Sequence, residues 1–357
     1  MNRVVAICAA TSATLALTAC ELGPKHSYQN GYRGTGMDTV RLKSVEKVKD
    51  DVPPPPYESP STQGPRARDV YQNVQVLGDV SEEQFSYTMA ASTQWIAPEK
   101  GCNYCHNPAN MASDEIYTKV VARKMLAMTR DLNQNWSKHV KQTGVTCWTC
   151  HRGNAIPVNY WTLPQAQREG IIGNRKGQND PIPATAFSSL PNDALSRYLT
   201  GNPATDTSIR VASTGSHPTP ANRLSTQETE HQYALMMHLS QALGVNCTHC
   251  HNADSFQSWS NSTPARAQAW YGLRMVRRIN GGYIAPLTNV FPPYRKGKMN
   301  DPFKVNCTTC HQGKAKPMNG YPMAKDYPAL WGPAATTTAA AMPAGAAAVA
   351  KASVANP

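Results

Sequence analysis

Four short segments combine two cysteines and a histidine at one fixed spacing. They read CNYCH, CWTCH, CTHCH and CTTCH, with two residues between the cysteines and a histidine directly after the second. Two thiols at this spacing can add to the two vinyl groups of a haem, and the histidine then lies under the iron as its proximal ligand. The thioether cysteines are then Cys102, Cys105, Cys147, Cys150, Cys247, Cys250, Cys307 and Cys310. The proximal histidines are His106, His151, His251 and His311.

Paired cysteines also occur in redox dithiols and in zinc knuckles. Neither of these requires a histidine directly after the second cysteine of each pair. Four covalently bound c-type haems are therefore the favoured prediction. Of the ten cysteines, only Cys8 and Cys20 lie outside the four motifs. No cysteine pair is therefore expected to form a disulfide.

The first residues are typical of a lipoprotein signal peptide. Arg3 precedes a short apolar run over residues 4–18, and Cys20 follows small residues at its end. This pattern predicts a signal peptide over 1–19 and lipidation of Cys20; a plain secretory peptide cleaved elsewhere is the alternative. Fifteen residues are too few to span a bilayer. Residues 20–80, with prolines at 53–56, are expected to form an acylated extended arm.

The composition leaves little ordinary core for a chain of 357 residues. Hydrophobic residues make up 40% of a sequence with 28 prolines and only five phenylalanines. Four apolar haems would fill the interior, so the expected fold is mainly α with long irregular loops. The formal charge of +12 is largely offset by about eight haem propionates, so no nucleic-acid partner is predicted.

The chain contains an internal repeat. Met89 and Met236 lie 147 residues apart, as do Asn133 and Asn280, and CHRGNAIP resembles CHQGKAKP. The repeat predicts two dihaem halves related by an approximate two-fold axis, over 81–160 and 225–333, joined by a segment over 161–224. The Ala/Pro-rich residues 334–357 are expected to be a disordered tail.

A helix is expected before each haem motif. Capping boxes begin at Ser81 and Ser225, Ser113 can cap a second helix, and Pro264 suits the first turn of a fourth. Gly244 is expected to end the third helix.

These helices carry candidate sixth ligands for the irons. A methionine on a helix stripe is usually core, but a haem with a proximal histidine often takes methionine or histidine opposite. Met89 and Met236 are equivalent in the repeat, and each precedes a motif closely. For the second and fourth haems, symmetry favours Met128 and Met275. Alternatively, His139 serves the fourth haem and Met125 the second; the other spare histidines, His26, His217, His231, His238 and His249, are expected to be surface or packing residues.

Together, these motifs resemble one family. Four such motifs in two unequally spaced pairs, a lipoprotein start, and methionines 17, 26 and 15 residues before the first three proximal histidines resemble the tetrahaem cytochrome subunit of purple-bacterial photosynthetic reaction centres. The resemblance covers nearly all of residues 20–333. It implies three His/Met haems and one His/His haem, with Met89, Met125, Met236 and His139 as the ligands opposite haems one to four.

The resemblance also implies a function without bond chemistry. Such subunits re-reduce the photo-oxidised special pair, with the third haem nearest to it and the first outermost. The implied partners are the membrane-bound core subunits and a soluble donor, either a c-type cytochrome or a high-potential iron-sulfur protein. The implied location is the periplasmic face of the inner membrane, through a lipid anchor. Glu21 after the lipid cysteine departs from the aspartate usual for retention there.

Two other functions fit the haem motifs alone. A multihaem reductase or peroxidase would need at least one open iron coordination site, whereas the assigned ligands close all four. An electron conduit to another complex often carries a transmembrane helix, which this sequence lacks. An electron carrier that is not an enzyme is therefore the favoured prediction.

Overall fold

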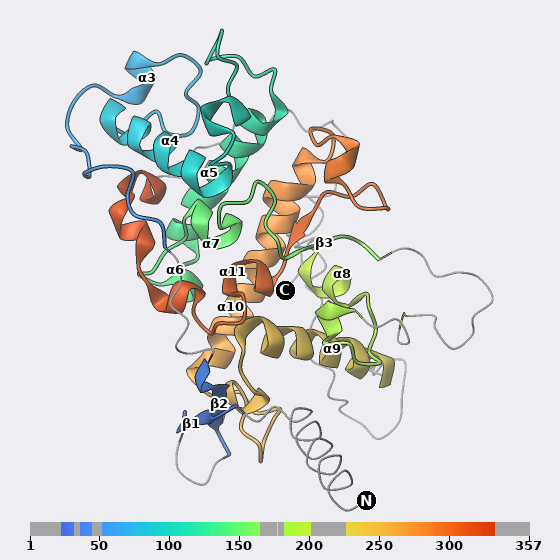
Figure 1. The fold of residues 1–357 in the computed structure, drawn as a ribbon. Coiled ribbons are helices and arrows are strands. Elements are labelled where there is room, and N and C mark those ends of the chain that lie inside the picture. Colours follow the sequence, from blue (N-terminus) through green and yellow to red (C-terminus); the bar gives the residue numbers. More distant parts are fainter. Residues whose placement is uncertain are drawn as a thin grey trace, which may run out of the picture. The chain divides into compact units, whose positions relative to one another are not determined.

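A computed structural model describes residues 23–31, 36–44, 52–164, 177, 182–200 and 226–332. The predicted signal peptide, Cys20, Ser225 and the C-terminal tail lie outside these residues. The chain divides into two compact units, one of residues 1–50 with 245–263 and one of residues 51–244 with 264–357. About half of the described chain is helical and most of the rest is irregular loop, which confirms the predicted fold class in part (Figure 1).

The smaller unit joins a hairpin to the third haem motif. Strands β1 (Lys25–Gln29) and β2 (Asp38–Leu42) pair antiparallel, and a 3₁₀ turn covers Cys247–His249. Asn246 connects the two, because its Oδ1 accepts from the Val40 N–H at 3.1 Å and its Nδ2 donates to the Asp38 carbonyl at 2.8 Å. The hairpin lies within the predicted 20–80 arm, which therefore contains regular structure.

The larger unit contains the other helices. They are α3 (Ala67–Val70), α4 (Glu82–Ile96), α5 (Tyr117–Asn135), α6 (Ser137–Val140), α7 (Cys147–His151), α8 (Ala194–Leu199), α9 (Thr226–Leu243), α10 (Pro264–Arg278) and α11 (Cys307–His311). Strands β3 (Tyr160–Trp161) and β4 (Lys304–Val305) form a short antiparallel pair. Short 3₁₀ turns cover Gly101–Tyr104, Pro183–Thr185, Ala285–Leu287, Pro293–Arg295, Pro317–Gly320, Met323–Asp326 and Pro328–Trp331, and a π-helical turn covers Ile279–Ile284. Among the described residues, no helix combines the length and apolar character needed to cross a membrane.

The helix ends follow local sequence signals, with one exception. Ser81 caps α4 by accepting from the Gln84 N–H at 3.2 Å, Pro264 is the first residue of α10, and Gly244 (φ +61°) follows the end of α9. The prediction that Ser113 caps the second helix is wrong. Its hydroxyl accepts instead from the Glu115 N–H at 3.2 Å, which holds a turn ahead of α5.

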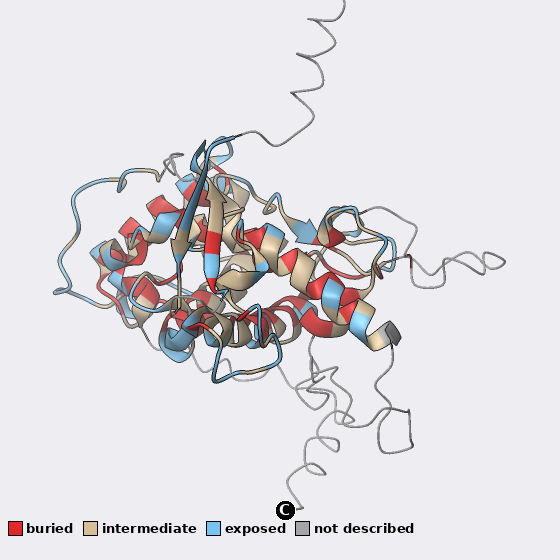
Figure 2. Ribbon diagram, turned by 90° about the horizontal axis from the view of Figure 1, so that it is seen from below, coloured by how far each residue is buried: buried red, intermediate tan, exposed pale blue. Residues whose placement is uncertain are grey.

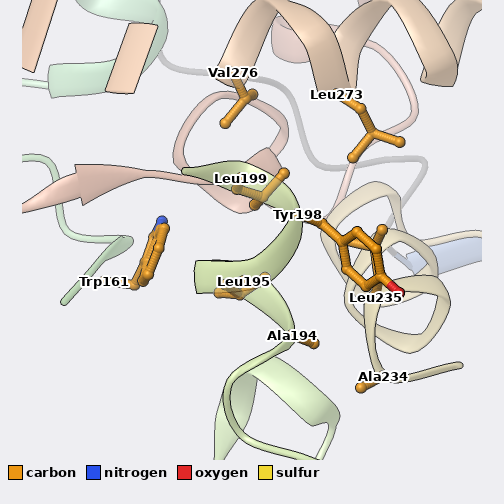
Figure 3. Packing of buried hydrophobic residues seen from close by; sticks show 9 residues of the cluster. All are labelled: Trp161, Ala194, Leu195, Tyr198, Leu199, Ala234, Leu235, Leu273 and Val276. Atoms are coloured by element: carbon orange, nitrogen blue, oxygen red, sulfur yellow. The ribbon is translucent and has the colours of Figure 1, made fainter. Parts of the chain in front are cut away.

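One core cluster unites α8, α9, α10 and β3 (Figure 3). Tyr198 and Leu199 at the end of α8 are fully buried there, with Leu235 from α9 and Leu273 from α10. Full burial of such side chains contributes about 1.5–3 kcal/mol each. The segment 161–224, predicted only as a connection, thus supplies part of the core.

A second cluster packs α4 against the chain after the fourth motif. Trp95 and Tyr87 from α4 are buried, and Trp95 meets the ring of Tyr327 edge-on with centroids 4.5 Å apart. The side chains of α4 are thus divided between this core and the opposite face. Buried, intermediate and exposed residues alternate along the helices in Figure 2, and Met89 and Met125 are among the half-buried ones.

Two buried asparagines, Asn133 and Asn280, hold the chain in the same way at two places. The Asn133 amide donates to the carbonyls of Val145 and Leu330 at 3.0 and 2.9 Å, and its oxygen accepts from the Val145 N–H at 2.7 Å. The Asn280 amide donates to the carbonyls of Val305 and Leu199, both at 2.9 Å, and its oxygen accepts from the Val305 N–H at 3.0 Å. Each asparagine therefore fixes the chain two residues before a CxxCH motif.

Removing one of these amides should destabilise the fold strongly. Asn133→Ala leaves three buried backbone groups without partners, at about 1–3 kcal/mol for each group. We expect the free energy of unfolding to fall by ~3 kcal/mol or more in denaturant titrations of the haem-loaded protein. The control is Gln134→Ala, which removes one exposed bond to the Trp331 carbonyl and should change stability by less than about 0.5 kcal/mol. Equal unfolding midpoints for the two variants would contradict this role.

Candidate haem sites

Each CxxCH motif folds into a single helical turn. In α7 and α11 the first cysteine, the second cysteine and the histidine stand at positions i, i+3 and i+4, which share one face of a helix. In the first motif the N–H groups of Cys105 and His106 both donate to the Cys102 carbonyl, at 3.1 and 3.0 Å. The turn therefore presents two thiols and an imidazole to the same side, as attachment of a haem requires.

Every predicted proximal histidine is oriented by a backbone carbonyl. His106 Nδ1 lies 3.0 Å from the Met111 carbonyl oxygen, and His151 Nδ1 lies 2.8 Å from that of Asn154. His311 Nδ1 lies 2.9 Å from the Lys314 carbonyl oxygen. A carbonyl can only accept, so Nδ1 carries the proton and Nε2 is left with its lone pair, which is the form that binds a metal.

The third motif, in the smaller unit, has the same construction. The N–H groups of Cys250 and His251 donate to the Cys247 carbonyl at 3.2 and 3.1 Å, and His251 Nδ1 lies 3.0 Å from the Phe256 carbonyl oxygen. The Phe256 ring stacks on the His251 imidazole with centroids 4.9 Å apart. Met236 lies on α9 in the larger unit, packed beside the α8 core cluster. Its pairing with His251 stays a prediction.

A cavity of about 810 Å³ connects the first and second motifs. Its walls come mainly from α4, α5 and the motif turns, and most of them are apolar. Met89 and His106 line it, as do Met125 and His151. A volume of this size suits a bulky cofactor, for which typical sites measure roughly 300–1,000 Å³. The residues present therefore fit haem, and the cavity brings Met89 and Met125 together with His106 and His151.

The alternative methionines lie elsewhere. Met275 is 5% exposed and packs in a core with Leu132, Ile279 and Ile284. Met128 packs beside the same two core clusters as Met125 but is absent from the cavity wall that Met125 lines. The cavity therefore favours Met125, whereas the repeat symmetry favours Met128.

At the fourth motif two histidines face each other. The rings of His139, from α6, and His311, from α11, have centroids 6.0 Å apart. An iron between two imidazoles would separate their ring centroids by roughly 6 Å, which is the sum of two metal–nitrogen bonds of about 2 Å and the distance from each nitrogen to its ring centre. His139 Nδ1 lies 2.8 Å from the Gln268 carbonyl oxygen, so its Nε2 is also available. The pair therefore fits a bis-histidine iron.

Burial keeps these imidazoles neutral. It lowers the pKa of His311 to about 4, with a further contribution from the charge of the neighbouring His139. Burial also lowers the pKa of His139 and of His151. Neutral imidazole is the metal-binding form, so at neutral pH these side chains need to lose no proton to coordinate iron.

The second and fourth motifs touch each other. The Cys150 and Cys310 sulfur atoms lie 2.9 Å apart, at the ends of α7 and α11. After the histidine of each motif comes a residue in a left-handed conformation, Arg152 in one and Gln312 in the other. The glycine that follows, Gly153 or Gly313, donates its N–H at 2.8 Å to a helix carbonyl. The two motifs thus have one local design and meet at their second cysteines.

Sequence reasoning missed some of the residues that build these sites. The carbonyl partners of the histidines carry no side-chain signal, so no sequence pattern could have indicated them. Sequence reasoning gave no role to Gly272, whose backbone lies against the His139 ring. A glycine inside a predicted helix was the available signal.

The chain was compared with known proteins. The family model for the photosynthetic reaction centre cytochrome C subunit matches residues 21–331. The photosynthetic reaction center cytochrome c subunit of Rubrivivax gelatinosus is 45% identical, over 92% of this chain and 89% of its own. That of Thermochromatium tepidum is 44% identical, over 92% and 81%, and that of Roseobacter denitrificans 39%, over 85% of each chain.

The matched region contains all four CxxCH motifs and every candidate ligand of the structure. Covalent c-type haem is what such cytochromes bind, and the motif turns, the oriented histidines and the apolar cavity are what it requires. Sequence, geometry and relatives agree, and the chain belongs to the family of photosynthetic reaction centre cytochrome c subunits.

Proposed function

We propose that the chain holds four c-type haems and passes electrons through them to the special pair of a photosynthetic reaction centre. The electron-transfer function follows from the family, and the number of haems from the four motifs. The observation that supports the number most directly is the repeated bond from each proximal His Nδ1 to a backbone carbonyl. Haem supplies a one-electron couple, and the chain holds it and sets its potential.

The proposed ligand sets follow the sequence prediction. Met89 with His106, Met125 with His151, and Met236 with His251 would give three His/Met irons, and His139 with His311 one His/His iron. Thioether ligands raise a haem potential relative to imidazole. The chain would therefore create sites of unequal potential by the choice of the second ligand, since the first is histidine at all four.

The contacts support an order of sites within the larger unit. Motifs one and two share a cavity, and motifs two and four touch through Cys150 and Cys310. The order would then be one, two, four. The third site, in the smaller unit, is proposed to lie nearest the special pair on the basis of the family resemblance.

We also propose the two-fold relation between two dihaem halves, residues 81–160 and 225–333. A residue that touches its own repeat equivalent must lie near the axis relating them. Cys150 and Cys310 do so, and Arg278 Nε lies 3.5 Å from Asp131 Oδ2, its equivalent 147 residues earlier. The matching bonds of Asn133 and Asn280 support the same relation.

The remaining partners follow from the family and the N-terminal sequence. A subunit of this family associates with the reaction-centre core and hence with its membrane. We propose that lipidation of Cys20 anchors the chain at the periplasmic face, and that a soluble c-type cytochrome or high-potential iron-sulfur protein supplies electrons near the first haem.

A flash experiment tests the function. In membranes containing this chain with reduced haems, a short flash should oxidise a c-type haem within milliseconds or faster, as the special pair recovers. Chemical oxidation of the haems beforehand should abolish the haem signal and slow the recovery, while the initial special-pair bleaching remains. A flash that bleaches the special pair but leaves reduced haem unchanged would refute the proposal.

A further inference from the structure

Helix α10 has a glycine in its interior that needs a packing reason. Gly272 lies between Pro264 and Arg278 and is buried. Glycine is the least favourable residue in a helix interior after proline. A buried glycine at such a place therefore indicates a close approach by another group.

The approaching group is the His139 imidazole. A Cβ atom built on Gly272 would lie 2.5 Å from His139 Cε1, 2.9 Å from Nδ1 and 3.1 Å from Nε2. The same ring bonds through Nδ1 to the Gln268 carbonyl, one turn earlier in α10. Lys138 Nζ, from the same short helix, lies 3.2 Å from Tyr271 Oη. Helix α6 thus places its histidine in the space left by the missing side chain.

The repeat shows what the other half has at this position. The offset of 147 that relates Asn133 to Asn280 relates Met125 to Gly272. The same offset relates Arg130 to Arg277, and it is supported by their bonds, since their Nε atoms donate to the carbonyls of Ala329 and Tyr198 at 2.8 and 2.6 Å. Met125 lines the cavity of the second motif. At the fourth motif the same position carries no side chain and admits a histidine from outside the helix.

We propose that Gly272 determines the second ligand of the fourth haem. It is a positioning residue, since it touches the ligand and not the iron: without a side chain it admits His139, whereas a methionine there would exclude the ring and offer its own sulfur. The inference rests on the proposed ligand pair His139 and His311. It explains how two halves of one repeat bind iron differently through a single position.

The test is Gly272→Met in the full-length, haem-loaded protein. The low-spin electron paramagnetic resonance signal of a bis-histidine haem should be lost. The near-infrared charge-transfer absorbance of ferric methionine-ligated haem should rise by about one third, as three such haems become four. The potential of the fourth haem should rise. A variant that keeps the wild-type bis-histidine signal overturns the inference.

The double variant Gly272→Met with His139→Ala is the control. If Met replaces the histidine as ligand, removing His139 from the Met variant changes neither spectrum. If His139 still binds, the double variant leaves an open iron that takes up carbon monoxide when reduced, as His139→Ala alone should. Carbon monoxide binding by the double variant would therefore contradict the exchange of ligands.

If methionine at position 272 prevents haem attachment, the variant Gly272→Ala tests the role of Gly272 instead. It adds only the Cβ that meets the ring, so His139 should be displaced and the ferrous fourth haem should bind carbon monoxide. An unchanged bis-histidine signal in this variant also overturns the role of Gly272. A wild-type protein without any bis-histidine signal would refute the proposed ligand pair itself, which is a separate result.

Discussion

Replacing Cys147 and Cys150 together with alanine is expected to yield a protein with three haems in place of four. Without either thiol the second motif has no covalent bond to a haem, and the thioether bonds of the other motifs are unaffected. The cavity shared with the first motif would lose part of its filling, so stability should fall as well. The haem-to-protein ratio of the purified chain, from the pyridine haemochrome absorbance, measures the loss.

The functional effect should be larger than the loss of one quarter of the haem. In the proposed order the second motif lies between the first and the fourth, so its haem links the two in the path. In the double cysteine variant, haems oxidised by a flash should remain oxidised when the soluble donor is added. In the control variant Trp148→Phe, which keeps both cysteines, the haems should be re-reduced normally. Unimpaired re-reduction in the cysteine variant would rule out the order one, two, four.

Exchanging Met236 for histidine should lower the potential of the third haem. Imidazole stabilises ferric iron relative to thioether, and axial ligands set haem potentials over a range of about 0.8 V. We expect a decrease on the order of 0.1 V for this single exchange. A redox titration followed in the haem absorbance bands would show one component shifted downward, and electron delivery to the special pair should change with it.

Met275→Leu is the matched control for that experiment. Met275 is buried among Leu132, Ile279 and Ile284, so leucine should fit with a cost below about 1.5 kcal/mol and leave all four potentials unchanged. A titration in which the Met236 variant matches the wild type would reject Met236 as a ligand. A shifted potential in the Met275 variant would instead favour the symmetric assignment of the fourth haem.

Much of the molecule could be predicted because its chemistry lies in short motifs. The CxxCH spacing already places three functional groups on one helical turn, and a serine or proline at a helix start acts within one turn. Ser81 and Pro264 are of this kind. The prediction for Ser113 was wrong because its hydroxyl could either cap the helix or hold the turn ahead of α5, and it holds the turn.

The remaining features depend on contacts between distant segments. Tyr198 and Leu199 lie in a stretch without a haem motif. Only the folded chain shows that their carbonyls accept hydrogen bonds from Arg277 of α10 and from Asn280 of the π-helical turn that follows it. The choice between Met125 and Met128 depends on which side of α5 borders the cavity. Periodicity places both near one face and the repeat favours Met128, so only the family resemblance led to Met125.

The carbonyl that orients each proximal histidine belongs to the main chain, and this limits how such a protein can evolve. A point substitution cannot remove a backbone oxygen. The donor strength that this bond gives to the imidazole is therefore effectively fixed, and it is the same in all four sites. Natural selection must then adjust the driving force between neighbouring centres through the opposite ligand, through nearby charges or through access of water. Those positions, and not the CxxCH turns, are where members of the family should differ when they adapt to different donors.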